Sequence, residues 1–227
     1  MKFFIKLLII LIAFSNITMS QAHVSHYDKL KSINFDIYRN NKLIGNHIFS
    51  FKKVDDQLHV VSDVNFEIKK LGIVIYKYKA TGTEIFSEGK LIKFNSKTNQ
   101  NGKEKYVNMK LENGEYIIDG SSYKGKAPID YFLGTWWDHG IAKAPAQISA
   151  VSGRIIKQTV TFLGKETIKL GNKNYNTLHF NFFSTDKKLV KGKKLNTDVW
   201  YDEKTLTWVK ASFKKKGHWE YKLLSIN

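Results

Sequence analysis

Serine and lysine residues three positions apart recur along the chain, and in this spacing a lysine can activate a serine for acyl transfer. The pairs are Ser50 and Lys53, Ser87 and Lys90, Ser121 and Lys124, Ser184 and Lys187, and Ser212 and Lys215. No pair is accompanied by the SDN and KTG motifs that complete such a site. Because lysine is abundant throughout, the recurrence indicates biased composition and does not indicate a nucleophile. Phosphate-binding loops, GxSxG and HExxH motifs are also missing from the sequence.

The chain has seven histidines and no cysteine. Without cysteine there can be no disulfide, thiol catalysis or thiolate metal site. Cleavage after Ala22 would leave His23 as the first residue, and its amine and imidazole could chelate copper. A second imidazole from His26, His139 or His179 would then complete a histidine brace like that of exported copper proteins. No other feature of those proteins is evident, so we expect neither a metal nor another cofactor.

An aromatic segment interrupts the regular pattern of the chain between Pro128 and Pro145, the only two prolines. Its aromatic residues are spaced too irregularly for a strand, which predicts a short helical or irregular insertion near 128–145. Aromatic side chains bury a large area each, so this insertion can cover one face or edge of a sheet. The cover is either a fixed plug or a lid over a ligand cavity. The candidate ligand-binding residues are Tyr131, Phe132, Trp136 and Trp137.

Apolar and polar residues alternate with a period of two over most of the chain, which predicts half-buried strands. Ile33, Phe35 and Ile37, for example, alternate with Asn34 and Asp36. Similar alternation follows in residues 60–68, 74–80 and 107–111 and resumes after about residue 148, with turn signals such as Asn101-Gly102 and Asn113-Gly114 between strands. No segment supplies the crossover helices of a parallel sheet. The predicted fold is all-β, a curled antiparallel meander that forms a spiral β-roll or half-barrel.

The first 22 residues have the pattern of a secretory signal peptide. Two lysines lead into an apolar run over residues 7–14, and the small residues Ser20 and Ala22 occupy the minus-three and minus-one positions of a cleavage site. The apolar run is shorter than the roughly 18 residues of a membrane helix. We therefore expect export to the periplasm or exterior, removal of residues 1–22, and a single all-β domain over residues 23–227 that is not an integral membrane protein.

The formal net charge is +17 at pH 7. Such a surface attracts anionic lipid head groups or acidic polysaccharide. Arg39 and Arg154 are the only arginines, and specific nucleic-acid recognition favours the planar guanidinium of arginine over lysine. We therefore expect an anionic envelope surface, and not nucleic acid, as a partner. Biased composition alone is the alternative source of the charge, since lysine, asparagine and isoleucine are all abundant.

Several stretches together resemble a family of exported bacterial proteins classed as a domain of unknown function. They are residues 35–51, an opening hairpin, then 71–78, 88–92 and 98–103, and finally 198–202, 208–213 and 217–223, which are similar to the closing strands. Residues 128–132 are similar to the proline and aromatic linker of the family, with Phe132 in place of a tryptophan. The resemblance implies a curled sheet akin to that of periplasmic lipoprotein carriers. It implies no established activity and no catalytic residues.

Three functions are compatible with these features. The first is a binding or carrier protein for an apolar or acyl-chain ligand, because a curved apolar sheet with an aromatic cover offers a concave site. The second is an envelope-associated structural or interaction protein without a ligand. The third is a secreted enzyme, for which no carboxylate pair or triad can be selected from the sequence. An open apolar cavity would distinguish the first function from the second.

Overall fold

The computed structural model describes residues 26–187, 189 and 194–227. The predicted signal peptide and its cleavage site after Ala22 lie outside these residues. Within them the chain is all-β, as the alternation predicts. None of the helices in this described part is long and apolar enough to cross a membrane.

The described residues form one 15-stranded sheet and two short 3-10 helices, η1 (His26–Lys29) and η2 (His139–Lys143). The strands of the first half are β1 (Ser32–Arg39), β2 (Lys42–Val54), β3 (Gln57–Lys70), β4 (Ile73–Ser87), β5 (Lys90–Gln100), β6 (Lys103–Glu112), β7 (Glu115–Gly120) and β8 (Lys124–Pro128). Those of the second half are β9 (Phe132–Leu133), β10 (Ala146–Ile148), β11 (Ile155–Leu170), β12 (Lys173–Ser184), β13 (Asn196–Asp202), β14 (Trp208–Lys214) and β15 (His218–Ile226).

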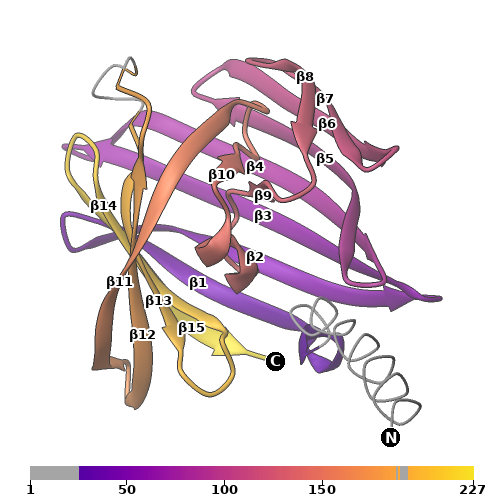
Figure 1. Ribbon diagram of the computed structural model, residues 1–227. Helices are drawn as coiled ribbons and strands as arrows, with labels where there is room; N and C mark the ends of the chain where they lie inside the picture. Colours follow the sequence, from indigo (N-terminus) through magenta and orange to yellow (C-terminus); the bar gives the residue numbers. More distant parts are fainter. Residues whose placement is uncertain (1–25, 188, 190–193) are drawn as a thin grey trace, which may run out of the picture.

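The predicted curled antiparallel meander is confirmed, with one exception to its antiparallel pairing. The strands follow the order β8-β7-β6-β5-β4-β3-β2-β1-β15-β14-β13-β12-β11-β10-β9, so β1 pairs with β15 in the middle of the sheet. The short strands β9 and β10 pair in parallel. The sheet stays open, because β8 and β9 form its two edges and do not pair. In Figure 1 the strands β11 to β15 cross in front of the long strands β1 to β4.

The concave face of the sheet carries the core. Along β1, Ile33, Phe35 and Ile37 are buried and the residues between them are partly exposed, which is the predicted alternation. The buried side chains form a large cluster that includes Phe49, Phe94, Phe182 and Trp208, and a smaller one of Ile37, Val64, Phe66 and Trp219. A curled sheet thus buries its inner face without a second sheet.

The insertion near 128–145 is short and irregular, as predicted, and consists of β9, η2 and the residues that join them. Asp138 caps η2, since its Oδ1 accepts a hydrogen bond of 2.9 Å from the amide of Gly140. The insertion lies within the curl of the sheet (Figure 1). Its Trp137 is fully buried, and the carbonyl of Trp137 accepts a 2.7 Å hydrogen bond from the hydroxyl of Tyr27. The aromatic segment is therefore part of the core on this side.

Candidate functional site

Two cavities lie on the concave face, one on each side of the aromatic segment. The first, here called the aromatic cavity, has a volume of about 170 Å³ and is lined by Trp136 together with residues of the sheet. The second, here called the carboxyl cavity, has a volume of about 480 Å³ and is lined by Tyr131, Phe132 and a different set of sheet residues. Both are candidate sites, since ligand sites are typically concave and mostly apolar.

Five aromatic residues and one histidine line the aromatic cavity, and two of the aromatic rings and the imidazole lie around the indole of Trp208. The ring centroid of Trp208 lies 5.8 Å from that of Trp136, 5.8 Å from that of Tyr221 and 6.1 Å from that of His47. The rings of Trp136 and Trp208 meet edge to face, with an angle of 75° between their planes. This arrangement is typical of packed aromatic side chains and gives the cavity a defined shape.

Three buried nitrogen atoms of these wall residues lack a hydrogen-bond partner among the residues that the structure describes. They are Nδ1 of His47, Nε1 of Trp136 and Nε1 of Trp208. The side chains of His47 and Trp208 are only 8% and 0% exposed. A buried polar group without a partner costs about 1–3 kcal/mol, so native proteins rarely keep several together. The wall of the aromatic cavity therefore includes three residues that each carry a buried nitrogen without a partner.

His47 is held as a neutral imidazole. Its Nε2 lies 2.9 Å from the hydroxyl oxygen of Ser62. Burial lowers the pKa of His47 to about 3. In a hydrolytic triad a third group orients the histidine through its other nitrogen, and no described residue bonds Nδ1 of His47. The pair therefore suits hydrogen bonding to a ligand better than proton transfer.

The carboxyl cavity contains a buried acid on β4, Glu84, which is 2% exposed. Its Oε1 accepts a hydrogen bond of 3.0 Å from Nε1 of Trp137. Burial raises the pKa of Glu84 to about 8, and the negative charge of Asp138 adds to the rise while the hydrogen bond from Trp137 opposes it. At neutral pH this carboxyl group is mainly protonated.

The four candidate residues from the sequence separate into three environments. Tyr131 and Phe132 line the carboxyl cavity, and Trp136 lines the aromatic cavity. Trp137 lines neither cavity and packs between Tyr27 and Phe86, with ring centroids 5.0 Å and 5.5 Å away. A ligand-binding role for the four residues stays a prediction, and the structure gives Trp137 the position of a plug.

Sequence reasoning missed His47, Glu84 and Trp208 as site residues. Glu84 had a detectable signal, because it is the one acidic residue on the inward-facing side of β4, between Gly82 and Phe86. His47 and Trp208 had none, since they come from strands far apart in the sequence and meet only because the sheet curls.

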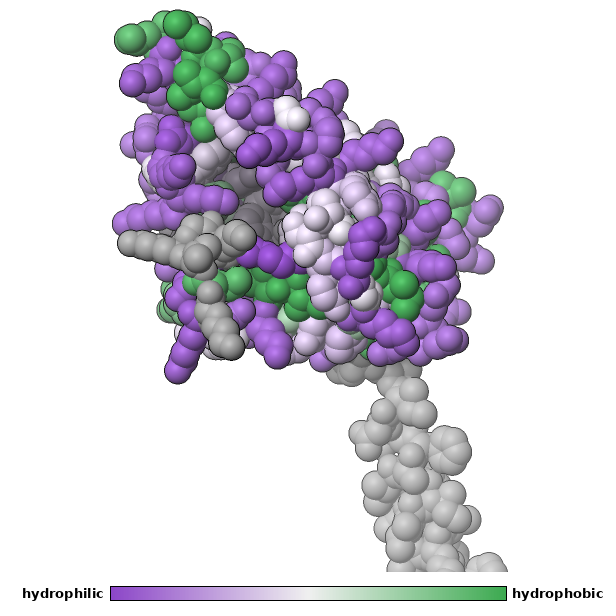
Figure 2. Space-filling model, turned by 90° about the horizontal axis from the view of Figure 1, so that it is seen from above, coloured by the Kyte–Doolittle hydropathy of each residue, from purple (hydrophilic) through white to green (hydrophobic). Residues whose placement is uncertain are grey.

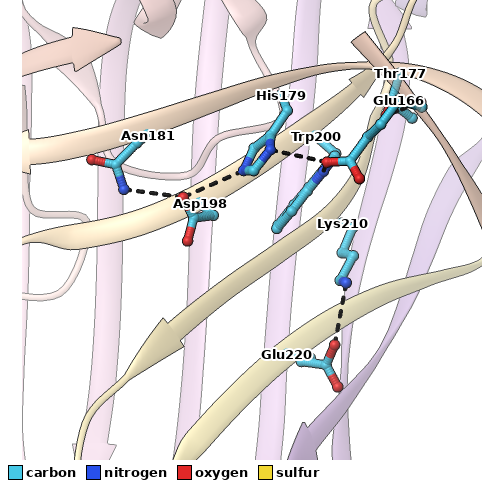
Figure 3. A network of polar contacts seen from close by, with 8 residues as sticks. All are labelled: Glu166, Thr177, His179, Asn181, Asp198, Trp200, Lys210 and Glu220. Atoms are coloured by element: carbon cyan, nitrogen blue, oxygen red, sulfur yellow. Dashed lines mark hydrogen bonds and ion pairs between the residues drawn. The ribbon is translucent and has the colours of Figure 1, made fainter. Parts of the chain in front are cut away.

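A separate polar network joins side chains of β11, β12 and β13 (Figure 3). His179 stands between two carboxylates, with Nδ1 2.9 Å from Oε1 of Glu166 and Nε2 3.3 Å from Oδ1 of Asp198. Its ring stacks on that of Trp200 at 4.1 Å, and Trp200 Nε1 donates to Glu166 at 2.5 Å. These contacts join three neighbouring strands, which indicates a structural role.

The possibility of a histidine brace is not tested, because His23 lies outside the described residues. Within the described ranges, no group of three or more histidine, aspartate or glutamate side chains could hold a metal ion. The absence of a metal or other cofactor therefore stays a prediction.

The fold and its cavities define a class of protein. Its members consist of one open, strongly curled antiparallel sheet, and one inserted segment lies beside the cavities on the concave face. Within this class the chain belongs to the family described as Domain of unknown function (DUF6134), which matches residues 35–224. The predicted resemblance to a domain of unknown function is thus confirmed at the level of the family, while export is not tested.

Solved structures are similar to this chain at low sequence identity. A beta-barrel-like protein of domain of unknown function DUF1849 from Brucella abortus matches with a TM-score of 0.58 and 12% identity, over 86% of this chain and 96% of that one. A DUF1329 family protein from Desulfovibrio piger matches with a TM-score of 0.25 and 8% identity, over 90% of this chain and 88% of that one. No curated protein matches the chain. The first structure supports the architecture alone.

Proposed function

We propose that this protein is a binding or carrier protein that holds an apolar or acyl-chain ligand in the aromatic cavity beneath Trp136. The observation that supports it most is the set of three buried, unpaired nitrogens in His47, Trp136 and Trp208, three residues that line the aromatic cavity. A plug that served packing alone would gain nothing from leaving these groups unpaired.

The size of the aromatic cavity restricts what it encloses. At about 170 Å³ it is smaller than the roughly 300–1,000 Å³ of sites that enclose drug-sized ligands. It therefore suits a small molecule or one end of a longer chain. The apolar side chains of the smaller core cluster continue along the concave face from the cavity, and Phe66 stacks there on Tyr78 with ring centroids 4.7 Å apart. Tyr76 and Tyr78, which pack against this cluster and are partly exposed, offer a surface for the rest of an acyl chain.

The unpaired donors specify the polar end of the ligand. An indole N–H can only donate, so Trp136 and Trp208 require an acceptor such as a carbonyl oxygen. An ester or a protonated acid supplies that oxygen without the large cost of burying a charge.

We further propose that the protein is exported by its first 22 residues to the periplasm or exterior, where it meets envelope lipids. Sequencing of the mature protein from its host tests this proposal and should return His23 as the first residue. A mature chain that begins at Met1 would contradict it.

The second candidate function is an envelope-associated structural or interaction protein without a ligand. The complete burial of Trp137 favours it, because a fixed plug needs no opening. Native mass spectrometry of protein purified from its own host distinguishes the two candidates. A bound lipid or acyl species that leaves on mild activation supports the carrier, and an apo mass in every preparation supports the structural alternative.

A further inference from the structure

The hairpin between β3 and β4 ends in a group of apolar side chains that face solvent. Leu71 is 94% exposed and Ile73 is 69% exposed, and Val74 and Ile75 beside them are also exposed. Residues 71–75 are here called the hairpin tip. Figure 2 shows a cluster of apolar side chains projecting at one corner of the molecule above hydrophilic ones, and the β3–β4 hairpin extends to the same side in Figure 1.

The turn at the hairpin tip contains a leucine in an unfavourable conformation. Leu71 has φ 50° and Gly72 has φ 81°. A residue with a side chain seldom adopts positive φ, and asparagine or aspartate does so most easily. Most other hairpin turns of this chain have a polar residue at positive φ, namely Asn40, Asp55, Glu88, Asn101, Asn113 or Lys216. Leu206 in the β13–β14 connection is a second leucine at positive φ, but its side chain is partly buried. Neither turn formation nor core packing therefore explains an exposed leucine here.

The antiparallel order of the strands places the hairpin tip at a strongly basic end of the sheet. The β1–β2, β3–β4, β5–β6 and β14–β15 turns all lie at this end. Their basic residues are Arg39, Lys42, Lys69, Lys70, Lys103, Lys105, Lys214, Lys215 and Lys216. Partial burial, followed by the nearby charges of Arg154, Lys105 and Lys216, lowers the pKa of Lys215, so the β5–β6 and β14–β15 turns lie near each other. The turns at the opposite end combine acidic residues, among them Asp55, Asp56, Glu88 and Glu203, with lysines such as Lys53, Lys90 and Lys204.

We propose that residues 71–75 insert into the head-group region of an anionic lipid bilayer, with the surrounding lysines on the lipid phosphates. An apolar projection within a basic surface fits this partner, because the apolar side chains enter the interface while each lysine near it is attracted to anionic lipid. A second copy of the chain would carry the same positive charge and be repelled. The inference does not depend on a ligand in the aromatic cavity.

This orientation places the membrane near the aromatic cavity. On β4 the cavity residues Tyr78 and Gly82 lie between the hairpin tip and Glu84 of the carboxyl cavity. The apolar strip of Phe66 and Tyr78 leads from the cavity toward the tip. A lipid that left the bilayer at the tip could therefore reach the cavity along a continuous apolar surface.

Vesicle flotation tests the proposal on the chain from His23 onward, which contains every described strand. One set of vesicles is pure phosphatidylcholine, and in the other set phosphatidylglycerol replaces about a quarter of the lipid. The variant Leu71→Asn combined with Ile73→Ser removes two exposed apolar groups while asparagine favours the turn. We expect it to lower partitioning into the anionic vesicles about tenfold or more, without loss of thermal stability. The control is Leu163→Ser, which removes a leucine that is 52% exposed on β11 and should leave partitioning unchanged.

Reversing the charge of lysines near the hairpin tip tests the proposal independently. Lys69→Glu with Lys70→Glu should lower partitioning about tenfold or more, and Lys52→Glu with Lys53→Glu on β2, toward the other end, should change it much less. Equal partitioning of all variants, or equal binding to neutral vesicles, would overturn the proposal. So would a stable dimer in sedimentation velocity that Leu71→Asn dissociates, because the tip would then serve a second copy of the chain.

Discussion

The indole Nε1 of Trp137 donates a hydrogen bond of 3.0 Å to Oε1 of Glu84, and both side chains are buried. The contact joins the aromatic segment to β4, the strand that lines both cavities. It fixes one of two adjacent tryptophans in the core and leaves the other, Trp136, beside the aromatic cavity. The segment is therefore anchored at Trp137, and any rearrangement on ligand entry should involve Trp136.

The raised pKa of Glu84 predicts a pH dependence of stability. Burial raises this pKa from 4.5 to about 8, so between these values the folded chain keeps a proton that the unfolded chain releases. Raising the pH through this window should lower the free energy of unfolding by up to about 1.4 kcal/mol per pH unit. The variant Glu84→Gln cannot titrate and should lose this part of the slope.

Thermal unfolding of both proteins at pH 5, 6, 7 and 8 measures the difference. The wild-type protein should lose stability relative to Glu84→Gln as the pH rises. Parallel curves for the two proteins would show that Glu84 titrates near its ordinary value and that the carboxyl group is accessible to water.

The two adjacent tryptophans should respond differently to truncation. Trp137→Ala removes a fully buried side chain and the donor to Glu84, and should cost about 3–5 kcal/mol of stability. Trp136→Ala removes a partly exposed side chain and should cost clearly less. Urea unfolding of the two variants checks this order, and equal losses would mean that both tryptophans belong to one plug.

His47 should remain neutral far below its ordinary titration range. Burial lowers its pKa from 6.5 to about 3, so its contribution to stability is complete above pH 6.5 and declines as the pH falls toward 3. NMR titration of the histidine ring signals measures the pKa directly, with His47→Asn to assign the resonance. A ring that titrates near pH 6.5 would contradict the buried environment of the aromatic cavity.

Gly45 should be intolerant of any side chain. A Cβ at this position would lie 2.0 Å from the backbone oxygen of Asn65 and 2.5 Å from Cβ of Phe66. Gly45→Ala should therefore separate β2 from β3 and cost about 1–3 kcal/mol or more. Gly102, with φ 85° and open space around it, is the control, since Gly102→Asn should cost less than about 1 kcal/mol. Equal melting temperatures for the two variants would contradict this explanation.

The fold was predictable because its determinants are local. Alternation such as that of Ile33, Phe35 and Ile37 predicts which face of a strand is buried. The Asn101-Gly102 pair predicts a tight hairpin, and both residues have positive φ in the structure. Strand alternation and turn signals are nearly sufficient to predict a meander, because each strand pairs with the next strand in the sequence. The parallel pair β9–β10 was not predictable, because two- and three-residue strands carry no readable period.

Of the candidate site, only the aromatic segment that covers it was predictable from the sequence. Proline boundaries and aromatic content identified the segment that holds Trp136, but the remaining wall depends on contacts across the curl. His47 and Trp208 are brought to 6.1 Å from strands that adjoin through β1 and β15. No local pattern encodes the curvature that joins them. The difference between Trp136 and Trp137 was equally hidden, since it depends on the positive φ of Trp136, 61°, which turns neighbouring side chains apart.

The central claim is that a ligand binds in the aromatic cavity beneath Trp136. The most direct test compares the binding of two matched ligands to the wild-type protein and to the variants Trp136→Phe and Trp208→Phe. Isothermal titration calorimetry would compare methyl decanoate, which has a carbonyl acceptor, with decane, which has none. Phenylalanine keeps an aromatic ring and removes the N–H donor. The control is Trp200→Phe, since Trp200 lines neither cavity.

A ligand site beneath Trp136 predicts saturable binding of the ester to the wild-type protein. Each of the variants Trp136→Phe and Trp208→Phe should lower the affinity for the ester about 2–10-fold. Trp200→Phe should bind like wild type, and decane should bind all four proteins with similar affinity. Absence of saturable ester binding to the wild-type protein, or ester affinities unchanged by both cavity variants, would contradict a ligand site beneath Trp136.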